Sequence, residues 1–230
     1  MPRDLEYTEV RERLVLTEDV AGYLWSRMEK FLEDGQYAEG EKRLLSDTGV
    51  LFNNMANVYR AQGDYDRAQE YYGKALAITE KVLGFEHPST ATTYNNIAGV
   101  YSDQGDYDRA LEYYGKALAI QEKVLGREHP STATTYNNMA LVYSDQGDYE
   151  RALEYYGKAL TIRERVLGRE HPDTATTYNN MANVFCAQGD YKKAMEYYEK
   201  ALSARMLKLG KNHPDTQSTL QAMERVKSFL

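Results

Sequence analysis

The sequence predicts an all-α solenoid of antiparallel helix pairs with capping helices, on three observations. The chain of 230 residues repeats every 42 residues, since the Tyr-Asn-Asn triplet at 94–96 returns at 136–138 and 178–180. The 42 residues from Ala91 and the 42 from Ala133 differ at only seven positions. Each copy holds two amphipathic stretches separated by a Gly-Asp pair. A period of this size is typical of repeats that bury their apolar faces only against their neighbours.

The first helix of a repeat is expected from the copy at 89–130. Ser89 or Thr90 follows Pro88 and could cap the helix by accepting from free backbone amides. Gly105 is expected to end the helix, because glycine adopts the left-handed conformation at little steric cost. Apolar side chains fall at helical spacing at Tyr94, Ile97, Ala98 and Tyr101.

The second helix of the same copy begins after Asp106, a good capping residue, and Gly126 closes it after about five turns. Its predicted buried stripe comprises Tyr107, Ala110, Leu111, Tyr114, Ala117, Leu118, Val124 and Leu125.

This phasing gives four repeats, at 48–88, 89–130, 131–172 and 173–214. Residues 215–230 are expected to form a C-terminal capping helix, because Glu224 and Lys227 place charged groups on the face that another helix would cover. Residues 1–47 are expected to hold an N-terminal segment and a degenerate capping helix pair, with Thr17 as a helix cap and Gly35 as a helix end. Trp25 is expected to pack within that pair, with anchoring of a partner as the alternative.

Composition narrows the function classes. A formal net charge of −7 argues against a nucleic-acid partner, whose phosphates need a basic surface. No apolar run approaches the ~18 residues of a membrane span, and the start lacks a signal-peptide stretch. The single cysteine, Cys186, cannot form an internal disulfide and fits a reducing cytoplasm. We expect a cytoplasmic protein without membrane or nucleic-acid partners.

The repeat resembles the tetratricopeptide repeat (TPR). Its 42-residue length and longer second helix resemble in particular the cargo-binding repeats of kinesin light chains. The resemblance covers residues 48–230 and implies a right-handed superhelical TPR array whose concave groove binds a protein or peptide segment. The residues that carry it in the third repeat are Tyr136, Met139, Ala140, Tyr143, Gly147, Tyr149, Ala152, Tyr156 and Ala159.

The candidate site is the stripe of residues on each first helix that is not expected to pack against neighbouring helices. We call this stripe the first-helix face. Its asparagines could hydrogen-bond an extended peptide backbone. By the kinesin light chain resemblance, the first asparagine of each pair contacts the ligand; alternatively, one asparagine of each pair bonds only the scaffold. The candidate residues are Asn53, Asn57, Arg60, Asn95, Asn96, Asp103, Asn137, Asn138, Leu141, Asp145, Asn179 and Asn183.

Two features of this face bear on specificity. One position reads Asn57, Gly99, Leu141 and Asn183 in successive repeats, which is expected of a pocket that reads side chains or of drift on a solvated face. The resemblance also implies basic residues after the tyrosine for acidic ligands, yet Asp103 and Asp145 occur there. A neutral or weakly basic partner segment is therefore expected.

No catalytic constellation or phosphate loop is found, so we expect a non-enzymatic adaptor without cofactor or metal. The four histidines occupy one loop position, and successive copies lie too far apart to share a metal. We expect each to pack against the next proline and helix start. The alternatives are a structural, self-associating array or a regulatory TPR module of a larger signalling protein. A monomer or weak homo-oligomer is expected.

Overall fold

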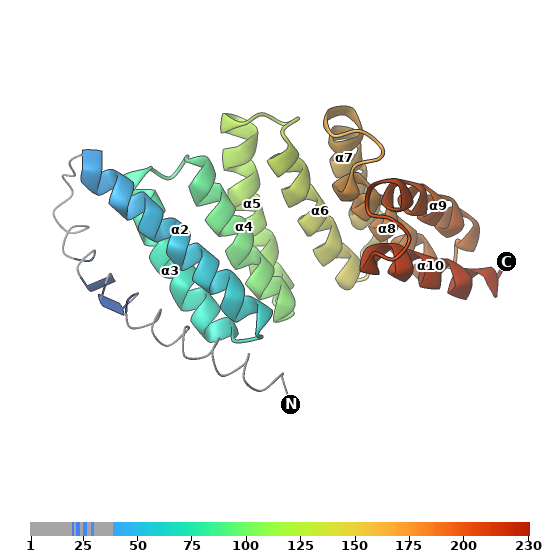
Figure 1. The fold of residues 1–230 in the computed structure, drawn as a ribbon, viewed down its shortest axis with the longest axis horizontal. Helices are drawn as coiled ribbons and strands as arrows, with labels where there is room; N and C mark the ends of the chain where they lie inside the picture. Colours follow the sequence, from blue (N-terminus) through green and yellow to red (C-terminus); the bar gives the residue numbers. More distant parts are fainter. Residues whose placement is uncertain (1–19, 21, 24, 27–28, 30–38) are drawn as a thin grey trace. The chain divides into compact units, whose positions relative to one another are not determined.

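A computed structural model describes residues 20, 22, 23, 25, 26, 29 and 39–230 (Figure 1). The predictions for Thr17 and Gly35 lie outside these residues. Within the described part, regular structure is helical throughout, and no helix is long and apolar enough to cross a membrane. The helices are α2 (Glu39–Ala61), α3 (Tyr65–Val82), α4 (Pro88–Asp103), α5 (Tyr107–Val124), α6 (Pro130–Asp145), α7 (Tyr149–Val166), α8 (Pro172–Ala187), α9 (Tyr191–Lys208) and α10 (Pro214–Lys227).

The chain divides into two compact units, Met1–Val100 and Tyr101–Leu230. In the first, α2 packs against α3, and Asn96 of α4 hydrogen-bonds Asn53 of α2. The Trp25 ring lies edge-on to Phe52, with 5.9 Å between ring centroids, which agrees with the packing role expected for the tryptophan.

Helix α2 differs from the expectation for the N-terminal part. It has 23 residues, whereas α4, α6 and α8 have 16 each, and it runs through the predicted boundary at 47/48. Thr48 lies inside the helix, where its hydroxyl donates to the carbonyl of Leu44 at 2.8 Å. The helix continues because no His-Pro pair precedes this position, unlike the starts of α4, α6 and α8.

In the second compact unit, α6 packs on α7, α8 on α9 and α9 on α10, while α5 meets α6 and α7 meets α8. Three-residue turns join α6 to α7 and α8 to α9, so each pair is an antiparallel hairpin. Fully buried alanines such as Ala140 and Ala152 let the helices approach closely around Tyr156. Such close packing of complementary apolar faces supplies most of the stability of helical repeats.

Most predicted helix ends are confirmed. The Asp106, Asp148 and Asp190 carboxylates cap α5, α7 and α9 by accepting a backbone N–H three residues on. Gly105 and Gly126 have φ of 77° and 92°, the left-handed conformation that ends a helix.

The cap predicted at Ser89 or Thr90 is wrong, because α4 begins at Pro88 and the Ser89 backbone N–H donates to His87 Nδ1 at 3.1 Å. Histidine, not serine or threonine, caps α6: His129 Nδ1 accepts from the Ser131 backbone N–H at 3.1 Å, and Pro130 is the first helical residue. Thr132 lies one position further, and its hydroxyl donates to the Gly126 carbonyl at 3.0 Å. The same arrangement recurs at His171 and His213. Because proline occupies the first helical position, the cap lies two residues before the serine and three before the threonine.

The buried stripe of the second helices also differs from the prediction. Val124 is 46% exposed, whereas the polar side chain of Gln121 is 4% exposed. On helix α10, Glu224 and Lys227 are exposed and paired at 2.5 Å.

Candidate functional site

In the first compact unit, neighbouring first helices are joined by their asparagines. Asn96 Nδ2 donates to Asn53 Oδ1 at 3.1 Å, linking α4 to α2. Asn57 is exposed, and its oxygen accepts from the Tyr72 hydroxyl at 2.5 Å. Asn95 is half-buried and also has an interaction partner. These side chains belong to the scaffold as well as to the first-helix face.

The guanidinium of Arg60 packs against α4 at Gly99. A Cβ atom added to Gly99 would lie 2.6 Å from Arg60 Cζ, so the missing side chain makes room for the guanidinium. Gly99 is therefore buried, although the sequence pattern placed it on the solvent side. The glycine is explained by this contact and does not mark an open pocket.

In the second compact unit, the exposed part of the first-helix face has mixed chemistry. Leu141 on α6 is 44% exposed, and Asn183 is the exposed equivalent on α8. Asp103 and Asp145, at the last turns of α4 and α6, are exposed. Although Asp145 is exposed overall, partial desolvation of its carboxyl raises its pKa.

In the repeats whose variable position is asparagine, a tyrosine of the second helix hydrogen-bonds that asparagine. The Tyr198 hydroxyl donates to Asn183 Oδ1 at 2.5 Å, as Tyr72 does to Asn57. Where the position is Leu141, the equivalent tyrosine, Tyr156, is buried, and Asn180 of the next first helix lies near its hydroxyl. Leu141 has no group that could hydrogen-bond a tyrosine, and it is 44% exposed.

Asn137 departs most from its predicted place, because its side chain is 7% exposed. Its Oδ1 accepts from Arg163 Nη1 at 3.4 Å and from the Thr177 hydroxyl at 3.3 Å. Asn138 beside it is half-buried and also bonded. The first asparagine of the pair thus contributes its oxygen to the scaffold, since a polar group placed this deep needs a partner.

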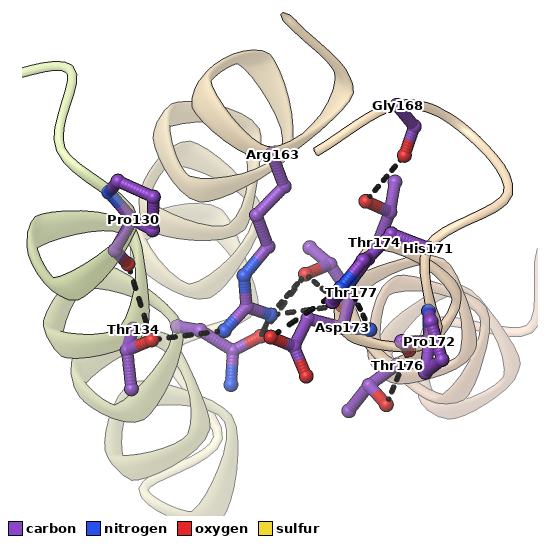
Figure 2. Close-up of polar contacts among 11 residues, drawn as sticks. Pro130, Thr134, Arg163, Gly168, His171, Pro172, Asp173, Thr174, Thr176 and Thr177 are labelled. Atoms are coloured by element: carbon purple, nitrogen blue, oxygen red, sulfur yellow. Dashed lines mark hydrogen bonds and ion pairs between the residues drawn. The ribbon is translucent and has the colours of Figure 1, made fainter. Parts of the chain in front are cut away.

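The buried partner of Asn137 is an arginine, Arg163, whose burial the pattern of apolar residues does not predict. Figure 2 shows Arg163 reaching from α7 towards Thr134 of α6 and Thr177 of α8. Its Nη1 donates to the Thr177 hydroxyl oxygen at 2.7 Å and to the Asp173 carbonyl at 2.9 Å. The side chain is 5% exposed, and its burial lowers the pKa of the guanidinium. One cation therefore joins three helices through uncharged acceptors.

The arrangement repeats one period later, at Arg205. Its Nη1 donates to Thr219 Oγ1 at 2.6 Å, to the Asp215 carbonyl at 3.0 Å and to Asn179 Oδ1 at 3.3 Å. In the earlier repeats this position holds Thr79 and Gln121, both buried. The sequence signal was a polar residue that recurs within an otherwise apolar stripe.

A separate hollow of about 710 Å³ lies between α7, α8 and α9. Two of its carboxylates already have partners: Glu164 bonds the Tyr178 hydroxyl and lies 3.7 Å from Arg169, and Glu170 lies 4.0 Å from Lys208. Such partly exposed ion pairs are typical of a solvated surface. Across the residues that the structure covers, no group of acidic, histidine or cysteine side chains could hold a metal ion.

Comparisons with known proteins agree with the helical repeat. A sequence model of the tetratricopeptide repeat family matches residues 47–123, 90–165, 131–207 and 173–229. A search of curated proteins returns no match.

Solved structures share the architecture. BtubC (BKLC) from P. vanneervenii has a TM-score of 0.74 at 24% identity, over 91% of this chain and 84% of that one. A Podosopora anserina protein, described as a kinesin light chain with nearly identical TPR-like repeats, has a TM-score of 0.66 at 26% identity, over 80% and 87% of the chains. Aspartyl phosphate phosphatase F from Bacillus subtilis has a TM-score of 0.68 at 21% identity, over 80% of this chain and 46% of that one.

Proposed function

Because the chain belongs to the tetratricopeptide repeat family, whose sequence model matches residues 47–229 in overlapping segments, we propose that its first-helix face binds an extended segment of a partner protein. The chain is an all-α TPR solenoid of the kinesin light chain-like type. TPR arrays are protein–protein interaction modules, and their fold is in general a scaffold without catalytic activity. The peptide-binding face, the adaptor role and the absence of an enzymatic activity are our proposals.

The main support for the proposal is that most apolar residues of the first helices are buried, whereas one leucine of α6 is exposed. Alanines, valines and tyrosines of α6 and α8 are buried in the repeat frame, as Ala140 and Val184 show. Leu141 nevertheless remains 44% exposed on the same helix, beside half-buried Asn138 and exposed Asp145. A leucine flanked by amide and carboxylate groups combines apolar contact with orienting hydrogen bonds, as binding sites for peptides do.

The charge of this face favours a neutral or weakly basic segment. Asp103 and Asp145 are exposed at the ends of their helices, and an acidic segment passing there would meet like charge. Arg163 and Arg205 do not offset this charge at the surface, because both are buried. They donate to the Asn137 and Asn179 oxygens and to the main-chain carbonyls at 173 and 215. Weaker binding of a basic peptide at high salt is the corresponding expectation.

The test uses 12-residue peptides selected from a random phage library on the wild-type protein. The binding of a labelled selected peptide is then measured by fluorescence anisotropy for Leu141→Lys and for Val166→Lys. Both parent residues are apolar and similarly exposed, at 44% and 48%, but Val166 lies on the second helix α7. We expect L141K to weaken binding at least about tenfold and V166K to leave it unchanged. Equal affinity of the two variants would reject the first-helix face as the site.

A further inference from the structure

Two asparagines of the second compact unit are held in one orientation by a buried guanidinium. We infer that Arg163 and Arg205 turn the carboxamides of Asn137 and Asn179 so that their Nδ2 amides face outward and bind oxygen acceptors of a partner segment. The inference deepens the proposed function, on which it rests, by assigning arginines of the second helices as positioning residues for the site.

The orientation follows from donor and acceptor chemistry. A guanidinium carries N–H donors and no acceptor, so only the carboxamide oxygen can face it. Arg163 Nη1 lies 3.4 Å from Asn137 Oδ1. The Thr177 hydroxyl lies 3.3 Å from the same oxygen and shares its one hydrogen with the Asp173 carbonyl at 3.2 Å. For Asn179 the matching distances from Arg205 and Thr219 are 3.3 and 3.2 Å. Turning either carboxamide by half a rotation would place its NH₂ group against the N–H donors of the guanidinium.

The outward amide nitrogen keeps access to solvent. Among the described residues, the one fully buried side-chain nitrogen or oxygen without a partner is Thr216 Oγ1. Asn137 Nδ2 is therefore not an enclosed, unsatisfied group, although the side chain as a whole is 7% exposed. Because its oxygen is already held by a donor, the carboxamide would lose little further entropy when a partner binds.

The earlier repeat shows that the fold tolerates an uncharged residue at this position. Gln121 is buried like Arg163, but its Oε1 accepts from the Thr135 hydroxyl at 2.7 Å. The equivalent threonine, Thr177, instead accepts from Arg163 at 2.7 Å. The threonine at this repeat position donates to the glutamine in one repeat and accepts from the arginine in the next. Arginine adds a donor set and a positive charge below the asparagine.

These properties define the chemistry of the bound group. A fixed N–H above a buried cation favours an oxygen acceptor, which an extended segment offers as main-chain carbonyls and an acidic segment or chain end offers as a carboxylate. We assign the main-chain carbonyl, because Asp145 on the same helix, α6, disfavours acidic segments.

The first test observes the side-chain amide signals of ¹⁵N-labelled protein by NMR while N-acetylglycine N-methylamide, a neutral carbonyl probe, or sodium acetate is added at constant ionic strength. We expect the Asn137 and Asn179 signals to move in the wild type. In Arg163→Gln the Asn137 response should fall at least about threefold while that of Asn179 persists, and Arg205→Gln should give the reverse. Each variant thus carries its own control for folding.

The probes separate the two acceptor sources. A response to the amide probe supports carbonyl binding, whereas a response to acetate alone supports the oxygen-acceptor site with a carboxylate ligand. An unchanged Asn137 response in R163Q would overturn the positioning role of Arg163, and no response to either probe in the wild type would overturn the site.

The second test needs no ligand. Asn137→Asp places a carboxylate against the guanidinium, so the pKa of that carboxyl, followed by ¹³C NMR, should be lower by about one unit or more with Arg163 than with Gln at 163. Equal pKa values would contradict the positioning. This result does not depend on partner binding, so it separates failure of the inference from failure of the first-helix face as a peptide site.

Discussion

Arg163 and Thr177 are joined at 2.7 Å in a site from which solvent is nearly excluded, and no carboxylate accepts from the guanidinium among the described residues. The cation is instead satisfied by a hydroxyl, a carboxamide and a main-chain carbonyl on α6 and α8. A buried charge costs several kcal/mol unless such groups solvate it. The contact therefore makes the junction of three helices sensitive to one side chain.

Removing this side chain should destabilise the second compact unit. Arg163→Ala leaves buried acceptors without donors and a cavity, and we expect a loss of about 3 kcal/mol in the free energy of unfolding by urea. Arg163→Gln should lose less, because Gln121 occupies the equivalent position. Arg165→Ala, at a 51% exposed neighbour on α7, serves as the control and should change stability by less than about 0.5 kcal/mol. Equal losses for R163A and R165A would contradict this account.

The histidine caps can be tested against the serine that follows them. His129→Ala removes the acceptor for the Ser131 backbone N–H and should cost about 1 kcal/mol of stability. Ser131→Ala keeps the His129 acceptor and should have little effect. Thermal unfolding followed by circular dichroism compares the two. A larger loss for S131A would restore serine as the cap.

Two glycines of α5 and its end should respond in opposite directions to alanine. Gly115 lies within the helix and has nothing within 4 Å of an added Cβ, so Gly115→Ala should stabilise the protein by up to about 1 kcal/mol. Gly126 has φ of 92°, and Gly126→Ala should destabilise it by about 1 kcal/mol. Urea denaturation measures both. Changes of the same sign would contradict the helix end assigned here.

The aspartate caps predict a pH dependence of stability. The backbone N–H and the side chain of Arg151 donate to Asp148, and these hydrogen bonds hold the pKa of its carboxyl below the ordinary value. Its contribution is complete above the unfolded pKa of about 3.9 and is lost as pH falls through the lower folded pKa. Asp148→Asn keeps an acceptor without the charge and should flatten the fall in melting temperature between about pH 5 and pH 2. Glu150→Gln, on the first turn of α7, is the control; an equal effect would refute the assignment.

The sequence predicted the fold well because glycine and aspartate residues mark the helix ends in each repeat. Gly105, Asp106 and Gly126 set the ends of α4 and α5, and their copies set the ends of later helices. Helix α2 runs through residues 47 and 48, because that stretch lacks the His-Pro pair and the glycine that mark the helix ends of later repeats.

The site was harder to predict, because burial of polar groups is not visible in a pattern of apolar residues. Asn137 has nearly the same sequence environment as the half-buried Asn95 and Asn179, and its partner Arg163 lies 26 residues away in sequence. Gly99 likewise has the sequence signature of an open position, and Arg60 from another helix covers it. Tertiary partners of this kind are set by contacts between helices and not by helical periodicity.

The most direct test of the proposed site is site-specific photo-crosslinking of a phage-selected peptide. Leu141 or Val166 is replaced by p-benzoylphenylalanine, and covalent peptide adducts are quantified by mass spectrometry after irradiation. The account predicts that adducts form from position 141, are competed by unlabelled peptide, and stay at background from position 166. Adducts from position 166 with none from position 141 would place the peptide on the second helices and contradict it.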